Sequence, residues 1–227
     1  MRLAKAAIDV GLFTTRADPM LAFWQKEIGL PFHETLPVGR GVHQLRHGIG
    51  ESVLKINHSR DPLPQAPAAG YSHLTIAQAG LSTPRELADP DGNRVTLVPP
   101  GHAGIEQLQM HLRVRDPAAH HDFFGRVLGL EPSGDGRYRC GVSLLSFERD
   151  VQARTDAQMR GVGYRYLTIQ VFDVVGEHRA LLARGASEGS APTRLGDVAA
   201  ISFVRDPDGN WIEISQRKSI TGSLEPL

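Results

Sequence analysis

The stretch Phe23-Trp24-Gln25-Lys26-Glu27-Ile28-Gly29-Leu30 returns in the second half of the chain as Phe123-Phe124-Gly125-Arg126-Val127-Leu128-Gly129-Leu130. Two further pairs of segments follow in the same order: residues 70–76 match residues 163–169, and Asp-Pro-Asp-Gly-Asn occurs at 89–93 and 206–210. Three matches in one order indicate an internal duplication. The predicted organisation is a first domain over 1–98, a Pro- and Gly-rich linker over 99–104, a second domain over 105–217 and a C-terminal tail over 218–227.

Each copy predicts the same opening elements. It begins with a strand in which apolar residues alternate, as at Ile8, Val10 and Leu12 in the first copy. A helix follows, opened by Asp-Pro at 18–19 or 116–117, because Asp caps free amides and Pro suits the first helical turn. Gly29 and Gly129 are expected to end these helices in the left-handed conformation. Strands joined by turns are expected over 32–58 and 137–149, which gives an α+β pattern.

The two copies are expected to differ in their second halves. Residues 173–185 predict a capped helix in the second copy, whereas the counterpart at 79–87 is short and contains Pro84. The first domain is therefore predicted to be abbreviated. In both copies Asp-Pro-Asp-Gly-Asn predicts a turn that leads into an alternating terminal strand.

The composition argues against nucleic acid and membranes as partners. The chain carries 25 Lys+Arg and 25 Asp+Glu, and no basic or acidic block stands out. Neither nucleic acid nor an anionic membrane surface is therefore an expected partner. The chain has neither a signal-peptide core nor a run of about 20 apolar residues, so a cytoplasmic location is expected. The only cysteine, Cys140, is predicted to be a packed strand thiol.

Several predicted strands carry polar side chains out of phase with their apolar neighbours. Successive side chains of a strand point to opposite faces, so these polar groups should share one face of a sheet while helices cover the other. A sheet of this kind can form a curved cup that binds a ligand. The polar side chains are Asp9, His73, Thr75, Thr96, Gln109, His111, Arg113, Tyr166, Thr168, Gln170 and Glu213. His120 and His121 are instead expected on a solvated helix surface.

The order of these motifs, repeated twice from about residue 5 to residue 216, resembles the vicinal oxygen chelate superfamily, which includes glyoxalase I, extradiol dioxygenases and bleomycin-resistance proteins. The resemblance implies two tandem glyoxalase-like domains of paired βαβββ modules, whose curved mixed sheets form a cup. The family's metal-ligand positions fall on Asp9, His73 and Thr96 in the first copy, and on Gln109, Tyr166 and Glu213 in the second. If strands are exchanged as in family members, Asp9 joins Tyr166 and Glu213, while Gln109 joins His73 and Thr96.

The candidate site residues follow from the resemblance and from the polar strand faces. Neither copy has two histidines and a carboxylate, so a divalent ion (Fe, Mn, Zn or Ni) is expected to bind weakly or not at all. If an ion is present, Glu213 is expected among its ligands. The candidates are Glu213, Tyr166 and His111 for catalysis, Asp9, Arg113 and Thr168 for substrate binding, and Gln109, His73 and Glu213 for metal.

Two functions are compatible with this pattern. The first is a metal-assisted enzyme, a lyase or ring-cleaving dioxygenase, that polarises a small oxygenated organic substrate. The alternative is a metal-free protein that binds a small molecule, as bleomycin-resistance proteins do. A monomer and a homodimer are both compatible with two fused domains.

Overall fold

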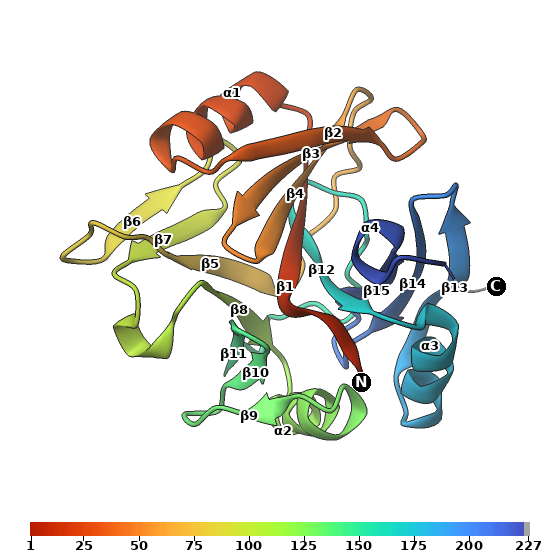
Figure 1. The fold of residues 1–227 in the computed structure, drawn as a ribbon. Helices are drawn as coiled ribbons and strands as arrows, with labels where there is room; N and C mark the ends of the chain where they lie inside the picture. Colours follow the sequence, from red (N-terminus) through yellow and green to blue (C-terminus); the bar gives the residue numbers. More distant parts are fainter. Residues whose placement is uncertain (225–227) are drawn as a thin grey trace.

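The strands form two mixed sheets in the computed structural model, which describes residues 1–224 (Figure 1). The eight-stranded sheet has the order β13 (Ser187–Leu195), β14 (Ala199–Arg205), β15 (Trp211–Arg217), β12 (Gly163–Val171), β1 (Leu3–Thr14), β4 (Ser52–Ser59), β3 (Val42–Ile49), β2 (Phe32–Pro37). The seven-stranded sheet has the order β6 (Arg85–Ala88), β7 (Arg94–Val98), β5 (Tyr71–Ala77), β8 (Leu108–Val114), β11 (Ser143–Arg149), β10 (Tyr138–Cys140), β9 (Glu131–Pro132). The predicted α+β fold with mixed sheets is confirmed.

Each sheet takes strands from both copies of the repeat, four from each copy in the eight-stranded sheet, and three from the first copy and four from the second in the seven-stranded sheet. In the eight-stranded sheet β1 pairs antiparallel with β12, so that Ile8 lies opposite Ile169. In the seven-stranded sheet β5 pairs antiparallel with β8, so that Leu74 lies opposite Met110. This is the strand exchange that the family resemblance implied. The domain boundaries at 98 and 105 mark the two copies of the repeat in the sequence and remain a prediction, because each sheet contains strands from both sides of them.

The first helix of each copy ends as predicted but only one begins as predicted. α2 (Pro117–Asp122) starts with Asp116, whose carboxylate accepts hydrogen bonds from the amides of residues 118 and 119. α1 (Ala17–Leu21) is preceded by Arg16, which gives no side-chain cap, so the predicted Asp18 cap is wrong. The helix begins at Ala17, which places Asp18 and Pro19 inside its first turn, where amides lack helical partners anyway.

Both helices continue as short π-helical segments, η1 (Ala22–Glu27) and η3 (Phe123–Val127). Gly29 and Gly129 then adopt positive φ angles of 82° and 69°, as expected for the ends of helices. A further 3-10 turn, η2 (His102–Gly104), lies in the predicted linker.

The difference between the second halves of the copies is also confirmed. α3 (Val174–Ala183) is capped by Asp173, whereas the chain after β5 passes through turns directly into β6. Lys218–Thr221 form a short helix, α4, in the segment expected to be a tail, and residues 225–227 of that segment lie outside the described residues.

His120 contradicts the expectation of a solvated helix surface. Its side chain is fully buried, and its Nε2 lies 3.3 Å from Asp206 Oδ2 in the second Asp-Pro-Asp-Gly-Asn turn. Its ring also packs against Phe124 and Phe147. The turn therefore docks on the inner side of α2, a contact that helix periodicity alone does not reveal.

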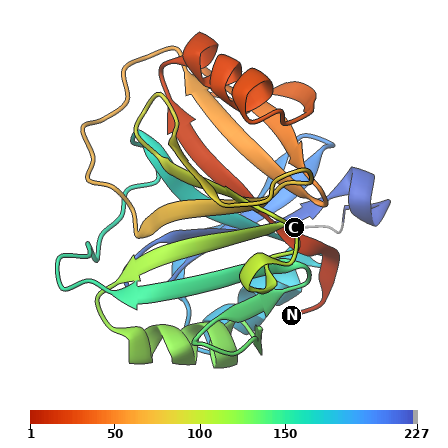
Figure 2. The ribbon, with the colours of Figure 1, turned by 90° about the vertical axis from the view of Figure 1, so that its left-hand side faces the viewer.

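One apolar core connects the sheets and helices. Ile8, Leu74, Met110 and Ile212 belong to a single buried cluster, although they come from both sheets and both copies. Figure 2 shows α1 and α2 at opposite outer ends of the molecule, with the sheets between them. The inward-facing strand residues bury their apolar side chains in this core, which leaves the alternate polar residues on the other face of each sheet.

The eight-stranded sheet is strongly curved. Arg217 on β15 contacts Glu34 on β2 at 2.9 Å, although four strands separate these two in the sheet order. In a flat sheet five strand spacings would hold them about 24 Å apart, beyond the reach of two side chains. The sheet therefore forms the predicted cup, called here the eight-stranded cup.

Candidate functional site

The floor of the eight-stranded cup is formed by residues in register on neighbouring strands. Asp9 on β1 lies opposite Thr168 on β12, and Thr168 lies beside Glu213 on β15. Lys55, on the same face of β4, extends toward this row. The four side chains are almost completely buried.

Lys55 is the centre of the floor. Its Nζ donates to Glu213 Oε2 at 2.8 Å and to Thr168 Oγ1 at 2.6 Å, and Thr168 Oγ1 donates to the same Glu213 oxygen at 2.6 Å. Burial lowers the pKa of Lys55, and the negative charges of Glu213 and Asp9 partly oppose this effect. The ammonium is thus an internal cation that neutralises Glu213.

Asp9 has its own set of partners. Its Oδ1 accepts hydrogen bonds from Lys5 Nζ and from the Val53 amide, and Gln170 Nε2 lies 3.4 Å from Oδ2. Asp9 therefore holds β1 to β4 and carries a second ion pair at the cup floor. The substrate-binding role expected for Asp9 stays a prediction.

Tyr166 lies two residues before Thr168 on β12, and its hydroxyl has different neighbours. Asn57 Nδ2 and Gln44 Nε2 lie 3.1 and 3.4 Å from its hydroxyl oxygen. Its ring lies over Gly11, where a Cβ atom would come within 2.2 Å of the ring carbons. Burial, followed by the charge of Glu213, raises the pKa of Tyr166. The hydroxyl therefore stays protonated, and it faces Asn57 and Gln44 at the side of the ion pair.

The two ends of the cup differ in chemistry. At one end the apolar residues Phe13, Val42 and Tyr166 pack with Phe203 and Trp211.

At the other end Glu34 Oε1 contacts Arg46 Nε at 3.2 Å and Arg217 Nη2 at 2.9 Å. Alternation along β3 and β15 places Val42 and Arg46, like Trp211 and Arg217, on one sheet face. The cup therefore runs from an aromatic end to a cationic end.

The polar face of the seven-stranded sheet is built around two histidines. His73 Nε2 lies 2.7 Å from Thr96 Oγ1, and His111 Nδ1 lies 2.8 Å from Ser146 Oγ. Burial lowers the pKa of both imidazoles, with Arg94 as the next cause for His73, whereas Glu148 opposes the shift for His111. Both side chains are partly exposed. Because their pKa values are lowered, both imidazoles are uncharged hydrogen-bonding groups at neutral pH.

Gln109 and Arg113 complete this face. Gln109 lies opposite Thr75, and its Oε1 is buried without a hydrogen-bond partner. Arg113 is half exposed and contacts Glu148 at 3.4 Å. This face is more open than the eight-stranded cup, and its Arg113–Glu148 pair is solvated.

The structure divides the predicted site residues between the two sheets. Asp9, Tyr166, Thr168 and Glu213 come together in the eight-stranded cup. His73, Thr96, Gln109, His111 and Arg113 come together on the seven-stranded sheet. The predicted metal set of Gln109, His73 and Glu213 is therefore not brought together.

Sequence reasoning missed Lys55, Asn57, Gln44 and Arg46. The signal was present for Lys55 and Asn57, because they alternate with the core residues Leu54 and Ile56 along β4. Reading 32–58 only as strands joined by turns left the faces of these strands unassigned.

The eight-stranded cup does not fit the divalent ion that the family resemblance implies. Among residues 1–224 no three His, Cys, Asp or Glu side chains are grouped to hold an ion. Asp9 and Glu213 are each already paired with a lysine ammonium, at the positions assigned to ligands. A divalent ion would have to displace Lys55 and would meet only oxygen donors.

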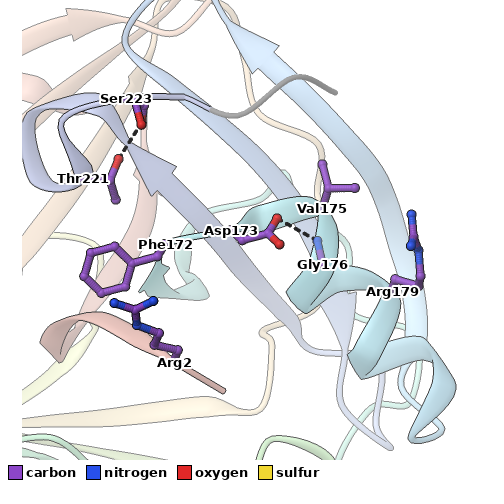
Figure 3. A pocket seen from close by; sticks show the side chains of 8 residues that line it. All are labelled: Arg2, Phe172, Asp173, Val175, Gly176, Arg179, Thr221 and Ser223. Carbon is purple, nitrogen blue, oxygen red and sulfur yellow. Dashed lines mark hydrogen bonds between the residues drawn. The ribbon is translucent and has the colours of Figure 1, made fainter.

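A cavity of about 590 Å³ lies away from both polar faces, between the N-terminal residues, α3 and the segment after α4 (Figure 3). Arg2 stacks over the Phe172 ring at 4.4 Å, and Asp173 faces the start of α3, where it caps Gly176. A second cavity, of about 260 Å³, is lined by Leu3, Leu130 and Arg139 among others. None of the predicted site residues lines either cavity.

The fold and its two polar faces define a protein of paired βαβββ modules with exchanged strands. Residues 102–214 match the model of the Glyoxalase/Bleomycin resistance protein/Dioxygenase superfamily. A lactoylglutathione lyase of Haemophilus influenzae is 28% identical over 134 residues, which are 53% of this chain and 98% of that protein. Residues 102–214 therefore belong to the glyoxalase/bleomycin resistance protein/dioxygenase superfamily.

Solved structures agree on the fold over almost the whole chain. A variant of glyoxalase I from Zea mays superposes with a TM-score of 0.75 at 15% identity and covers 99% of this chain and 96% of its own. A putative dioxygenase from Bacillus subtilis gives a TM-score of 0.70 at 14% identity, with 96% and 86% coverage. No helix in residues 1–224 is long and apolar enough to cross a membrane.

Proposed function

We propose that this glyoxalase/dioxygenase-like protein binds a small oxygenated organic molecule in the eight-stranded cup without a metal ion. The observation that carries the proposal is the ammonium of Lys55, held at 2.8 Å by Glu213 and at 2.6 Å by Thr168. A positive charge is thus already present where a metal ion would polarise a ligand oxygen. Lys55 would donate to that oxygen, and Glu213 would hold the ammonium of Lys55 in place.

Thermal stability in the presence of candidate ligands tests this function. A panel of small carbonyl, hydroxy and carboxylic compounds, with lactoylglutathione included because of the Haemophilus influenzae relative, is expected to contain molecules that raise the melting temperature. Lys55→Met and Glu213→Gln should remove this effect. His73→Leu, on the other sheet, is the matched control and should retain it. A shift that survives Lys55→Met and Glu213→Gln but not His73→Leu would refute the assignment to this cup.

A second candidate is a metal-assisted enzyme of the glyoxalase or dioxygenase type that uses the seven-stranded face. The observation in its favour is the buried Gln109 Oε1, which has no hydrogen-bond partner, on the face that also carries His73 Nε2. An amide oxygen and an imidazole are both ordinary ligands of divalent ions. Thr96 would be the weak third donor.

Elemental analysis separates the two candidates. The protein is incubated with Fe²⁺, Mn²⁺, Zn²⁺ or Ni²⁺ and then desalted. The first candidate predicts no stoichiometric ion. The second predicts an ion that is lost in His73→Leu and Gln109→Ala but retained in Glu213→Gln. An ion lost in Glu213→Gln would contradict both candidates and would restore the role expected for Glu213 from the sequence.

A further inference from the structure

The charged side chains of the eight-stranded cup do not balance. Lys5 pairs with Asp9 and Lys55 pairs with Glu213, whereas Arg46 and Arg217 share Glu34. Within the described residues this network contains four cations and three carboxylates. One guanidinium charge is therefore left without a carboxylate of its own.

The unmatched charge lies in a poorly hydrated place. The side chains of Arg46 and Arg217 are 8% and 16% exposed, whereas the shared Glu34 is 42% exposed. Burial lowers the pKa of Arg217 and the neighbouring charge of Arg46 adds to this effect, whereas the charges of Glu34, Asp9 and Glu213 oppose it. Two desolvated guanidinium groups close together favour the approach of an anion.

Glu34 already shows how an acid group can bind here. Both guanidinium groups contact the same oxygen, Oε1, at 3.2 and 2.9 Å. Glu34 lies on the edge strand β2 and is partly open to solvent, so it can turn outward. A carboxylate from a ligand could then take its place or join it, with hydrogen bonds from both arginines.

The opposite end of the cup suits an apolar body. Val42 and Arg46 are four residues apart on β3, which is about 13 Å along a strand. Phe13, Phe203 and Trp211 stand with Val42 at the apolar end. This distance matches a small molecule that has an acid group at one end and an aromatic or aliphatic group at the other.

We infer that the ligand of the eight-stranded cup is a small organic anion whose acid group is held between Arg46 and Arg217 and whose apolar part contacts the Trp211 end. The inference rests on the proposed function and specifies the class of ligand.

The test compares 3-phenylpropionate with 3-phenylpropionamide, which has nearly the same shape but no charge. Binding is measured by calorimetry and by tryptophan fluorescence, in which Trp211 is the reporter because Trp24 is fully buried in the core. The acid should bind at least about tenfold more tightly than the amide. Arg46→Gln and Arg217→Gln should each remove most of this preference, and Glu34→Gln should strengthen acid binding because it removes the competing carboxylate.

Arg126→Gln is the matched control, because Arg126 is an exposed arginine paired with Asp122 on the surface of a helix. It should leave the preference unchanged. Equal binding of acid and amide, or a preference that survives Arg46→Gln and Arg217→Gln, overturns the inference and leaves the proposed function intact. If neither compound binds and no other member of the ligand panel does, the proposed function fails as well.

Discussion

Replacing Lys55 with methionine should destabilise the fold strongly, because it leaves Glu213 buried without a counter-ion. The two side chains are only 4% and 9% exposed, and their charged atoms are 2.8 Å apart. Removing one partner of such a pair costs about 3–5 kcal/mol, most of it from the carboxylate that remains. The double variant Lys55→Met/Glu213→Gln should recover most of this loss, because it removes both charges.

Urea unfolding followed by circular dichroism measures these free energies of unfolding, provided that the slope of the transition is unchanged. A single variant that costs less than about 1 kcal/mol, or a double variant no more stable than the single one, would refute the idea that Lys55 serves as the internal cation of the cup.

Three further results are expected. Burial lowers the pKa of His47 from 6.5 to about 4, so between these pH values the unfolded chain binds a proton that the folded chain does not, and stability falls as the pH drops. Urea unfolding at several pH values should show a loss of about 3 kcal/mol in the parent protein that His47→Gln does not show. Identical pH profiles for the two proteins would contradict this prediction. Cys140 is fully buried and its pKa is raised to about 12, so a thiol reagent should label it only after unfolding, and rapid labelling of the native protein would show that the strand opens. Arg165 is fully buried and donates to the carbonyls of Pro67, Gly161 and Val162 at 2.7–2.9 Å. Arg165→Met should therefore lower the free energy of unfolding by at least about 3 kcal/mol in the same assay. A loss below about 1 kcal/mol would show that these hydrogen bonds do not stabilise the fold.

Local patterns predicted those parts of the molecule that depend on neighbouring residues. Alternation along the strands placed Asp9, Thr168 and Glu213 on a polar face, and the Asp-Pro pair at 116–117 marked the start of a helix. The strand exchange came only from the family resemblance, because strand periodicity does not specify partners that are distant in sequence.

Other features depend on tertiary geometry and could not be predicted in this way. The contact of Arg217 with Glu34 exists because the sheet curls, and the burial of His120 exists because a turn from the end of the chain docks on α2. Lys55 is a different case. Its face was readable from the sequence, but its reach to Glu213 depends on how β4, β1, β12 and β15 lie side by side.

The pairing of β1 with β12 also determines when the protein can fold. Ile8 meets Ile169, so roughly 160 residues must leave the ribosome before the first strand has its antiparallel neighbour. Until then the edge of β1 is open to pairing with other chains, which makes the nascent protein sensitive to aggregation. Neither half of the gene product should fold alone, whereas two fragments cut in the linker should regain the native sheets only when both are present.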